Sequence, residues 1–206
     1  MSPTITVKTG SPFARLLGIG AVRGSRVVDN AEMCTMIDSS DEWIQQRTGI
    51  VERRWVGEGQ DVKSLAIESA TKALASAGLQ ATDIDAVIVA TITYTRQTPS
   101  LAAIVAGELG CGDAAAFDLS AACAGFSYGV TLADSMVRSG SATNVLLIAS
   151  EVLTDITNPQ DRSTAFLFAD GAASVVIGPS DEPAIGPAVW GSDGTRADAI
   201  TMPTWL

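Results

Sequence analysis

The sequence of 206 residues contains no histidine. A mechanism that needs a histidine base therefore cannot be completed by these residues alone. Aromatic residues are also scarce, at 5%, whereas hydrophobic residues make up 47% of the chain. A core rich in small and branched side chains is typical of helices packed closely on a sheet, and the length suits one large domain or two small ones.

The three cysteines, Cys34, Cys111 and Cys123, lie far apart in the sequence. Their spacing fits neither a disulfide framework nor a metal site. Reduced thiols favour a cytoplasmic location. The first twenty residues lack the basic and apolar pattern of a signal peptide, and no apolar run approaches the length of a membrane span. We therefore expect neither a metal nor a membrane.

Basic residues are few: 13 stand against 23 acidic ones, which gives a net charge of −10. This balance argues against binding of nucleic acid or of an anionic membrane surface. It is compatible with a local basic patch around an anionic substrate. The sequence also lacks a dinucleotide-binding glycine motif, a phosphate-binding P-loop and a serine nucleophile elbow.

What the chain does contain is an alternation of apolar runs with helix-period segments. Strands are predicted at 15–22, 84–91, 114–119 and 144–150, and helices at 61–77, 100–109 and 124–138. The run at 84–91 is apolar almost throughout, as expected of a strand buried on both faces. The alternation predicts an α/β fold with a mostly parallel central sheet.

Other segments give weaker patterns. Residues 51–56 are expected to form a strand whose basic residues point outward, and residues 183–190 a further strand. Asp170 and Gly171 separate two apolar runs, which is typical of a hairpin turn. Residues 1–12 are expected to form a loose arm.

Cys123 follows the strand that ends near Phe117 and precedes the helix at 124–138. We expect the strand to be buried. A helix start offers unpaired backbone N–H groups and the positive end of the helix dipole. Such positions favour a thiolate, whose pKa falls from about 8.5 to roughly 3.5–7.5 in documented cases. Cys123 is therefore either a reactive nucleophile or a small buried hydrophobic residue.

A second candidate site lies on a short helix that is predicted to begin at Ser40 or Asp41 and to end at Gly49. Trp43 and Arg47 are four residues apart and share one face of this helix. An indole next to a guanidinium can bind a flat ring beside a phosphate. The alternative is a packed surface tryptophan next to a solvated arginine.

Together these segments resemble the amino-terminal part of the β-ketoacyl-acyl carrier protein synthase III family. The residues of the motifs are most similar to those of actinobacterial members. The match runs from about residue 13 to the end of the chain. The segments that carry it are Asp38-Ser-Ser-Asp-Glu-Trp-Ile, Arg47-Thr-Gly-Ile, Gln97-Thr-Pro-Ser, the stretch around Cys123, Asp161-Arg162, Phe168-Ala-Asp-Gly-Ala, Glu182-Pro-Ala-Ile-Gly and Trp190-Gly-Ser-Asp-Gly.

The resemblance implies a thiolase-like fold, which consists of two similar βαβαβαββ halves. On this basis residues 13–180 would be the amino-terminal half, preceded by the arm at 1–12. Residues 181–206 would begin the connection to a carboxy-terminal half that is missing here. We therefore expect a truncated or partly sequenced synthase.

The resemblance also implies residue roles. Cys123 corresponds to the nucleophile that takes the acyl group from acyl-CoA. Trp43 corresponds to the tryptophan that stacks on the adenine of CoA, Arg47 and Thr48 to contacts on its phosphate side, and Arg162 to the arginine on the other face of the adenine.

Four positions correspond to the acyl pocket: Thr98, Leu153, Leu167 and Phe168. Some family members carry phenylalanine at the position of Thr98, at the dimer interface. A small residue there would leave room for a primer longer than acetyl.

The implied reaction condenses an acyl-CoA primer with malonyl-acyl carrier protein, releases CO₂ and CoA, and starts fatty-acid synthesis in a cytoplasmic homodimer without a cofactor. The histidine and asparagine that the family uses for decarboxylation lie in its second half. We therefore expect the 206-residue chain to be inactive in condensation. Two alternatives stay open: a condensing enzyme of polyketide or other secondary metabolism, and a non-catalytic half-protein that pairs with a second chain.

Overall fold

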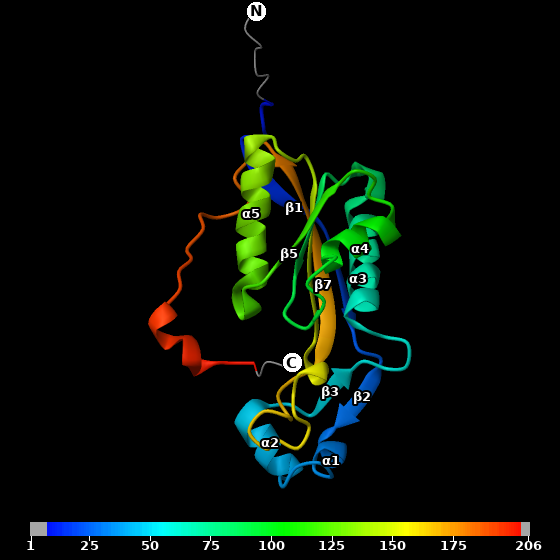
Figure 1. Ribbon diagram of the computed structural model, residues 1–206, viewed down its shortest axis with the longest axis vertical. Coiled ribbons are helices and arrows are strands. Elements are labelled where there is room, and N and C mark those ends of the chain that lie inside the picture. Colours follow the sequence, from blue (N-terminus) through cyan, green and yellow to red (C-terminus); the bar gives the residue numbers. More distant parts are fainter. Residues whose placement is uncertain (1–7, 203–206) are drawn as a thin grey trace, which may run out of the picture.

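The computed structural model describes residues 8–202 (Figure 1). Its centre is a five-stranded sheet with the strand order β1-β7-β6-β4-β5, and a second sheet pairs β2 with β3. The strands are β1 (Phe13–Arg23), β2 (Arg26–Asp29), β3 (Glu52–Trp55), β4 (Ala86–Ala90), β5 (Ala115–Leu119), β6 (Val145–Val152) and β7 (Asp170–Ser180).

Five α-helices are present in the described residues: α1 (Asn30–Met33), α2 (Asp41–Thr48), α3 (Val62–Ala77), α4 (Leu101–Leu109) and α5 (Gly125–Ser139). Short 3₁₀ turns lie at Ala81–Asp83, Ala122–Ala124, Leu153–Asp155 and Gly194–Ala199. The order β1-α3-β4-α4-β5-α5-β6-β7 confirms the predicted βαβαβαββ pattern. The segment β2-α1-α2-β3 is inserted between β1 and α3.

Four of the five central strands run in one direction. β4 is parallel to both β5 and β6, whereas β7 is antiparallel to β6 and to β1. β1 therefore runs the same way as β4, β5 and β6. This confirms the mostly parallel sheet that the sequence predicts.

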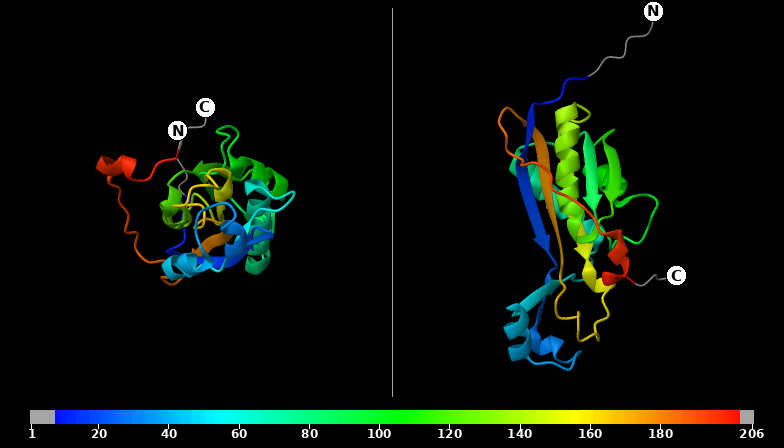
Figure 2. Two further views of the ribbon diagram at one scale, coloured as in Figure 1. Left: turned by 90° about the horizontal axis from the view of Figure 1, so that it is seen from below. Right: turned by 90° about the vertical axis from the view of Figure 1, so that its left-hand side faces the viewer.

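Helices cover both faces of the sheet. Alternate residues of β4 serve the two faces: Val87 and Val89 pack in the cluster with α3 and α4, and Ile88 packs in the cluster with α5. All five residues of β4 are buried, as the apolar run predicts. Figures 1 and 2 show α5 on one side of the sheet and α3 with α4 on the other.

The inserted segment forms a small unit at one end of the sheet (Figure 2). Its core contains Val28, Met33 and Ile44, which are fully buried. Ala165 and Phe166, from the loop between β6 and β7, pack into the same core. This loop therefore joins the small unit to the end of the central sheet.

The predicted hairpin at Asp170 and Gly171 is wrong, because these two residues begin β7. Asp170 is only 3% exposed. Its carboxylate accepts hydrogen bonds from the backbone N–H of Val56 (2.8 Å) and of Thr154 (3.0 Å). An Asp-Gly pair between apolar runs is typical of a hairpin turn. Here the Asp170 carboxylate instead binds the segments that contain Val56 and Thr154 in the interior.

Three further expectations need correction. Arg53 of β3 does not point outward but is 4% exposed, since its guanidinium finds hydrogen-bond acceptors inside the small unit. Residues 183–190 form no strand. β5 is only partly buried because it is an edge strand of the sheet, so one of its two edges is not paired with another strand.

Of the expected arm, residues 1–7 lie outside the described residues. Ser11 is bound to the body of the protein: its backbone N–H donates to Val137 O (3.3 Å), and its hydroxyl donates to Ser180 O (3.0 Å).

Candidate functional site

The predicted site residues follow the carboxyl ends of the four parallel strands. The small unit with Trp43 comes after β1, Thr98 after β4, Cys123 after β5, and the loop with Arg162 after β6. Parallel strands place their carboxyl ends at one edge of the sheet, which is where open α/β sheets bind ligands. Figure 1 shows the start of α5 at this edge, facing the small unit. The topology thus brings segments that are far apart in sequence to one end of the molecule.

Cys123 lies in the 3₁₀ turn Ala122–Ala124, directly before α5. Its thiol is free and exposed. α5 is 15 residues long, and within residues 8–202 no side chain caps its first turn. The N–H groups of Ala124 and Gly125 donate to the carbonyls of Ala121 and Ala122 within this turn, and the positive end of the α5 dipole lies next to the cysteine. The structure confirms the predicted strand–cysteine–helix arrangement, and Cys123 is exposed in this chain.

The backbone on either side of Cys123 is constrained. Ala122 has a φ of +43°, a left-handed conformation that costs an alanine about 1–2 kcal/mol and that clusters at functional sites. Gly125 is buried, and a Cβ placed on it would lie 3.0 Å from the Cβ of Ala90. The glycine therefore lets α5 begin close against the end of β4.

Trp43 on α2 lies close to two arginines. The guanidinium carbon of Arg47 is 5.4 Å from the centre of the indole, and that of Arg162 is 5.2 Å away. Phe166 supports the indole edge-on at 5.4 Å. Cations at these distances interact favourably with an aromatic ring. The structure thus brings together Trp43 and Arg47, which share one face of α2, and Arg162, which lies in the loop after β6.

α2 has well-defined ends. The hydroxyl of Ser40 accepts a hydrogen bond from Trp43 N (3.2 Å), and Gly49 ends the helix with a φ of +73°. Hydrogen bonds from Gln45 and Asn30 hold the pKa of Asp41 below its usual range. The hydroxyl of Thr48 donates to Ile44 O (2.7 Å), so its proton is already used at the helix end.

Asp161, the residue before Arg162, organises the loop that carries this arginine. The carboxylate of Asp161 accepts hydrogen bonds from Ser163 N (2.8 Å), from the Ser163 hydroxyl (2.6 Å) and from the Thr164 hydroxyl (2.7 Å). The Ser163 and Thr164 hydroxyls lower the pKa of Asp161. Since these bonds fold the chain around Asp161, they fix the turn from which Arg162 reaches Trp43.

Thr98 is exposed on a loop that two carboxylates anchor. Glu151 of β6 accepts hydrogen bonds from the backbone N–H of Ile92 (2.9 Å) and Thr93 (3.0 Å) at the start of the loop. Asp118 of β5 accepts from Leu101 N (2.7 Å) where the loop enters α4. Both anchors come from strands whose ends form the site.

The other three predicted acyl-pocket residues lie in the loop after β6. Leu153 is half-buried, Leu167 is 42% exposed, and Phe168 is half-buried. The carbonyl of Phe168 accepts a hydrogen bond from Trp55 Nε1 (3.4 Å). All three follow the carboxyl end of β6, which lies at the same edge of the sheet as the start of α5.

Sequence reasoning missed two residues of this region. Phe166 supports Trp43, and its place four residues after Arg162 is the signal that could have indicated it. The hydroxyl of Ser39 is buried without a hydrogen-bond partner, one residue before the cap of α2. A buried hydroxyl without a partner cannot be found from the sequence, because it depends on how the loop packs.

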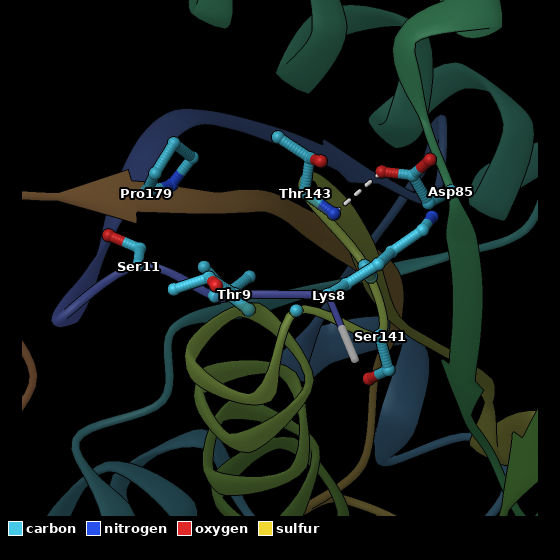
Figure 3. Close-up of a pocket in the computed structure, with 11 residues that line it drawn as sticks. Lys8, Thr9, Ser11, Asp85, Ser141, Thr143 and Pro179 are labelled. Carbon is cyan, nitrogen blue, oxygen red and sulfur yellow. Dashed lines mark hydrogen bonds between the residues drawn. The ribbon is translucent and has the colours of Figure 1, made fainter. Parts of the chain in front are cut away.

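A pocket of about 470 Å³ lies elsewhere, between residues 8–11, the end of α5 and the end of β7 (Figure 3). It is lined mainly by backbone and small side chains. The carboxylate of Asp85 is occupied there by the backbone N–H groups of Thr143 (2.7 Å) and Asn144 (3.0 Å). None of the predicted site residues lines this pocket.

Between residues 8 and 202, no cluster of histidine, cysteine and acidic side chains is suited to hold a metal ion. In the same range, no helix is both long enough and apolar enough to span a bilayer.

Comparison with known proteins agrees with the fold and the motifs. Residues 117–194 match the family model of 3-oxoacyl-[acyl-carrier-protein (ACP)] synthase III. The chain is 53% identical over 191 residues to a β-ketoacyl-[acyl-carrier-protein] synthase III of Streptomyces glaucescens, covering 93% of this chain and 57% of the relative. It is 50% identical over 196 residues to the mycobacterial β-ketoacyl-[acyl-carrier-protein] synthase III of Mycobacterium marinum, covering 95% of this chain and 58% of the relative.

Among solved structures, the chain is similar to the priming β-ketosynthase of the R1128 polyketide biosynthetic pathway. The TM-score is 0.90 at 45% identity, over 94% of this chain and 57% of that protein. It is also similar to 3-oxoacyl-[acyl-carrier-protein] synthase III of Aquifex aeolicus, with a TM-score of 0.79 at 40% identity over 82% of this chain and 55% of that one. The chain thus spans somewhat more than half the length of these relatives. By sequence and by fold the chain is therefore similar to thiolase-like β-ketoacyl-[acyl-carrier-protein] synthases III, and among them to those of actinobacteria.

Proposed function

We propose that this chain carries the acyl-accepting site of a β-ketoacyl-acyl carrier protein synthase III, in which Cys123 takes the acyl group from an acyl-CoA primer. The observation that carries the proposal is the exposed Cys123 at the start of α5, at the same edge of the sheet as the cluster of Trp43, Arg47 and Arg162. A soft nucleophile suits a thioester, and the positive end of a helix dipole suits the oxyanion that forms.

The proposed transfer is a simple exchange of thioesters. The thiolate of Cys123 attacks the carbonyl carbon of acyl-CoA and forms a tetrahedral oxyanion. The positive end of the α5 dipole stabilises that oxyanion. The carbon–sulfur bond to CoA then breaks, so CoA leaves as a thiolate and an acyl-cysteine remains. We propose that this step needs no metal and no cofactor.

The CoA nucleotide is proposed to bind at Trp43. Its adenine would stack on the indole, where Arg47 and Arg162 supply positive charge for phosphates and planar groups for stacking. Thr48, the last residue of α2, is proposed to contact CoA on its phosphate side.

The carbon–carbon bond-forming step is proposed for the whole protein, with malonyl-acyl carrier protein as the second substrate. Its decarboxylation leaves an enolate that attacks the acyl-cysteine, and the acyl group moves from sulfur to carbon. The 206 residues contain no histidine to stabilise the enolate, so we assign only the acyl transfer to them. A cytoplasmic homodimer is the assembly we propose.

A second candidate is the priming step of polyketide synthesis, which the likeness to the R1128 priming β-ketosynthase favours. Both candidates use the same acyl-cysteine and differ in the primer and in the carrier protein that supplies the extender. Comparing fatty-acid and polyketide carrier proteins as acceptors distinguishes them.

The test is acylation of Cys123. After incubation with acetyl-CoA or a branched acyl-CoA, the peptide with Cys123 should gain the mass of the acyl group, and Cys123→Ser should abolish that gain. Burial raises the pKa of the Cys111 thiol, so Cys111 should stay unmodified. Cys111→Ser should therefore leave the acylation of Cys123 unchanged. A folded chain whose Cys123 remains unmodified at saturating acyl-CoA would refute the proposal.

A further inference from the structure

The small unit contains a buried cation that the proposed reaction does not use. Arg53 is 4% exposed, and burial lowers the pKa of its guanidinium. Its hydrogen-bond partners are neutral oxygens: Nη1 donates to Val28 O (3.2 Å) and Asp29 O (3.1 Å), and Nη2 donates to Oδ1 of Asn30 (2.5 Å). Burying an arginine without a bonded carboxylate is costly, so its contacts need an explanation.

Arg53 fixes which way the amide of Asn30 points. A guanidinium has only donors, so it must face the amide oxygen of Asn30. The amide nitrogen then faces the other way, toward α2. It donates to Oδ1 of Asp41 (2.7 Å) and to the carbonyl of Ile50 (2.8 Å).

These two acceptors lie at opposite ends of α2. Asp41 is the first residue of the helix, and Ile50 follows the glycine that ends it. One amide group therefore holds both ends of the helix that carries Trp43 and Arg47. Asn30 is itself 2% exposed, so water does not compete for these bonds.

We propose that Arg53 is a positioning residue: through the amide of Asn30 it holds α2 so that Trp43 and Arg47 meet Arg162 in the geometry that binds the CoA nucleotide. Arg53 touches neither Trp43 nor the proposed ligand. This inference rests on the proposed function for the identity of the ligand, whereas the control of α2 by Arg53 can be measured without any ligand.

The first test compares the same substitution at neighbouring positions. Arg53→Lys keeps the charge but loses the fork that reaches both carbonyls and Asn30. Arg54→Lys is the matched control, because Arg54 makes one exposed ion pair with Glu52 (3.1 Å). Arg53→Lys should weaken CoA binding in calorimetry by about tenfold, the size expected for a lost charge-assisted hydrogen bond, whereas Arg54→Lys should leave it unchanged.

The second test removes the N–H donors of residue 30 and leaves Arg53 in place. Asn30→Asp still accepts from Arg53, so the β2–β3 pair should fold, but it loses both donors to α2 and faces the Asp41 carboxylate. We expect weaker CoA binding and faster hydrogen exchange of the α2 amides. Adding Asp41→Asn supplies a donor from the other side and should restore much of both properties.

The outcomes separate the two proposals. Folded Arg53→Lys and Asn30→Asp variants with wild-type CoA affinity and wild-type exchange in α2 would overturn the positioning role. If the wild-type chain does not bind CoA, the proposed function fails. In that case the exchange data alone decide: faster exchange of α2 in Asn30→Asp and its recovery in the double variant support the role, and unchanged exchange overturns it.

Discussion

Thr98 and Asp161 show how single side chains shape the two ends of the proposed site. Thr98 is small and exposed, on a loop whose start and end are anchored by Glu151 and Asp118. Asp161 holds the turn that presents Arg162 to Trp43. Each residue gives a prediction of its own.

Replacing Thr98 with phenylalanine should narrow the range of primers. The added ring takes up space where we propose that longer acyl chains lie. Acylation of Cys123 by branched or longer acyl-CoA should slow by about tenfold or more, as expected for an overfilled hydrophobic pocket, while acetyl-CoA should react almost as before. Competition between two acyl-CoA primers, read by peptide mass, measures the ratio. An unchanged ratio would show that Thr98 does not limit the primer.

Asp161 should make the stability of the protein sensitive to acid. Its pKa is lowered in the folded protein, so its carboxylate adds stability above the unfolded-state pKa of about 3.9, and that stability is lost as the pH falls through the lower folded value. Asp161→Ala should therefore unfold at lower urea concentration than wild type at pH 7. The difference between the two proteins should begin to shrink below about pH 4 and should vanish once the pH is below the folded-state pKa of Asp161. A difference that stays constant across this range would contradict the hydrogen bonds assigned to Asp161.

At the scale of elements, capping residues allowed the helices to be predicted closely. Ser40, Asp61 and Ser100 accept hydrogen bonds at the starts of α2, α3 and α4, and glycines end the same helices. These signals are local, since a cap and its partner lie three residues apart. Apolar runs likewise indicated the buried strand β4.

Elements that depend on distant partners could not be predicted. Asp170 begins a strand because Val56 and Thr154 supply donors, and neither is near it in sequence. Arg53 turns inward because Asn30 and the end of β2 offer acceptors. In the site, Cys123 and the pair Trp43–Arg47 were indicated by local pattern, and Arg162 only by family resemblance; the support from Phe166 required the folded chain.

The contact between β1 and α3 gives a prediction for packing. A Cβ on Gly20 would lie 2.2 Å from Ser69 O and 2.5 Å from Ala73 N, both backbone atoms of α3. Gly20→Ala should therefore destabilise the protein by about 1–3 kcal/mol or more, because the helix must move away from the strand.

Gly107 offers the matched control for that substitution. It lies on the exposed side of α4, where a Cβ meets nothing within 4 Å. Gly107→Ala should raise stability by roughly 0.5–1 kcal/mol through helix propensity. Urea unfolding of both variants measures the two effects. Equal effects would contradict the close packing of β1 on α3.

At the scale of the whole molecule, the parallel sheet is what assembles the site. Three strands, β4, β5 and β6, end in the loops of Thr98, Cys123 and Arg162, and β1 leads into the small unit with Trp43. The protein carries a net charge of −10, yet Arg47 and Arg162 meet at one aromatic ring. An acidic protein can in this way still offer a local site for an anionic nucleotide.

The central claim is that Cys123 and the cluster of Trp43, Arg47 and Arg162 form one site for acyl-CoA. The most direct measurement is the rate of Cys123 acylation by acyl-CoA and by the matching acyl-pantetheine, which lacks the nucleotide, in wild type and in Trp43→Ala. Wild type should react faster with acyl-CoA. Trp43→Ala should lose that preference by about 10- to 100-fold, as expected for the loss of two cation–π contacts and of base stacking, while its rate with acyl-pantetheine stays the same. An unchanged preference for acyl-CoA in folded Trp43→Ala would contradict the claim.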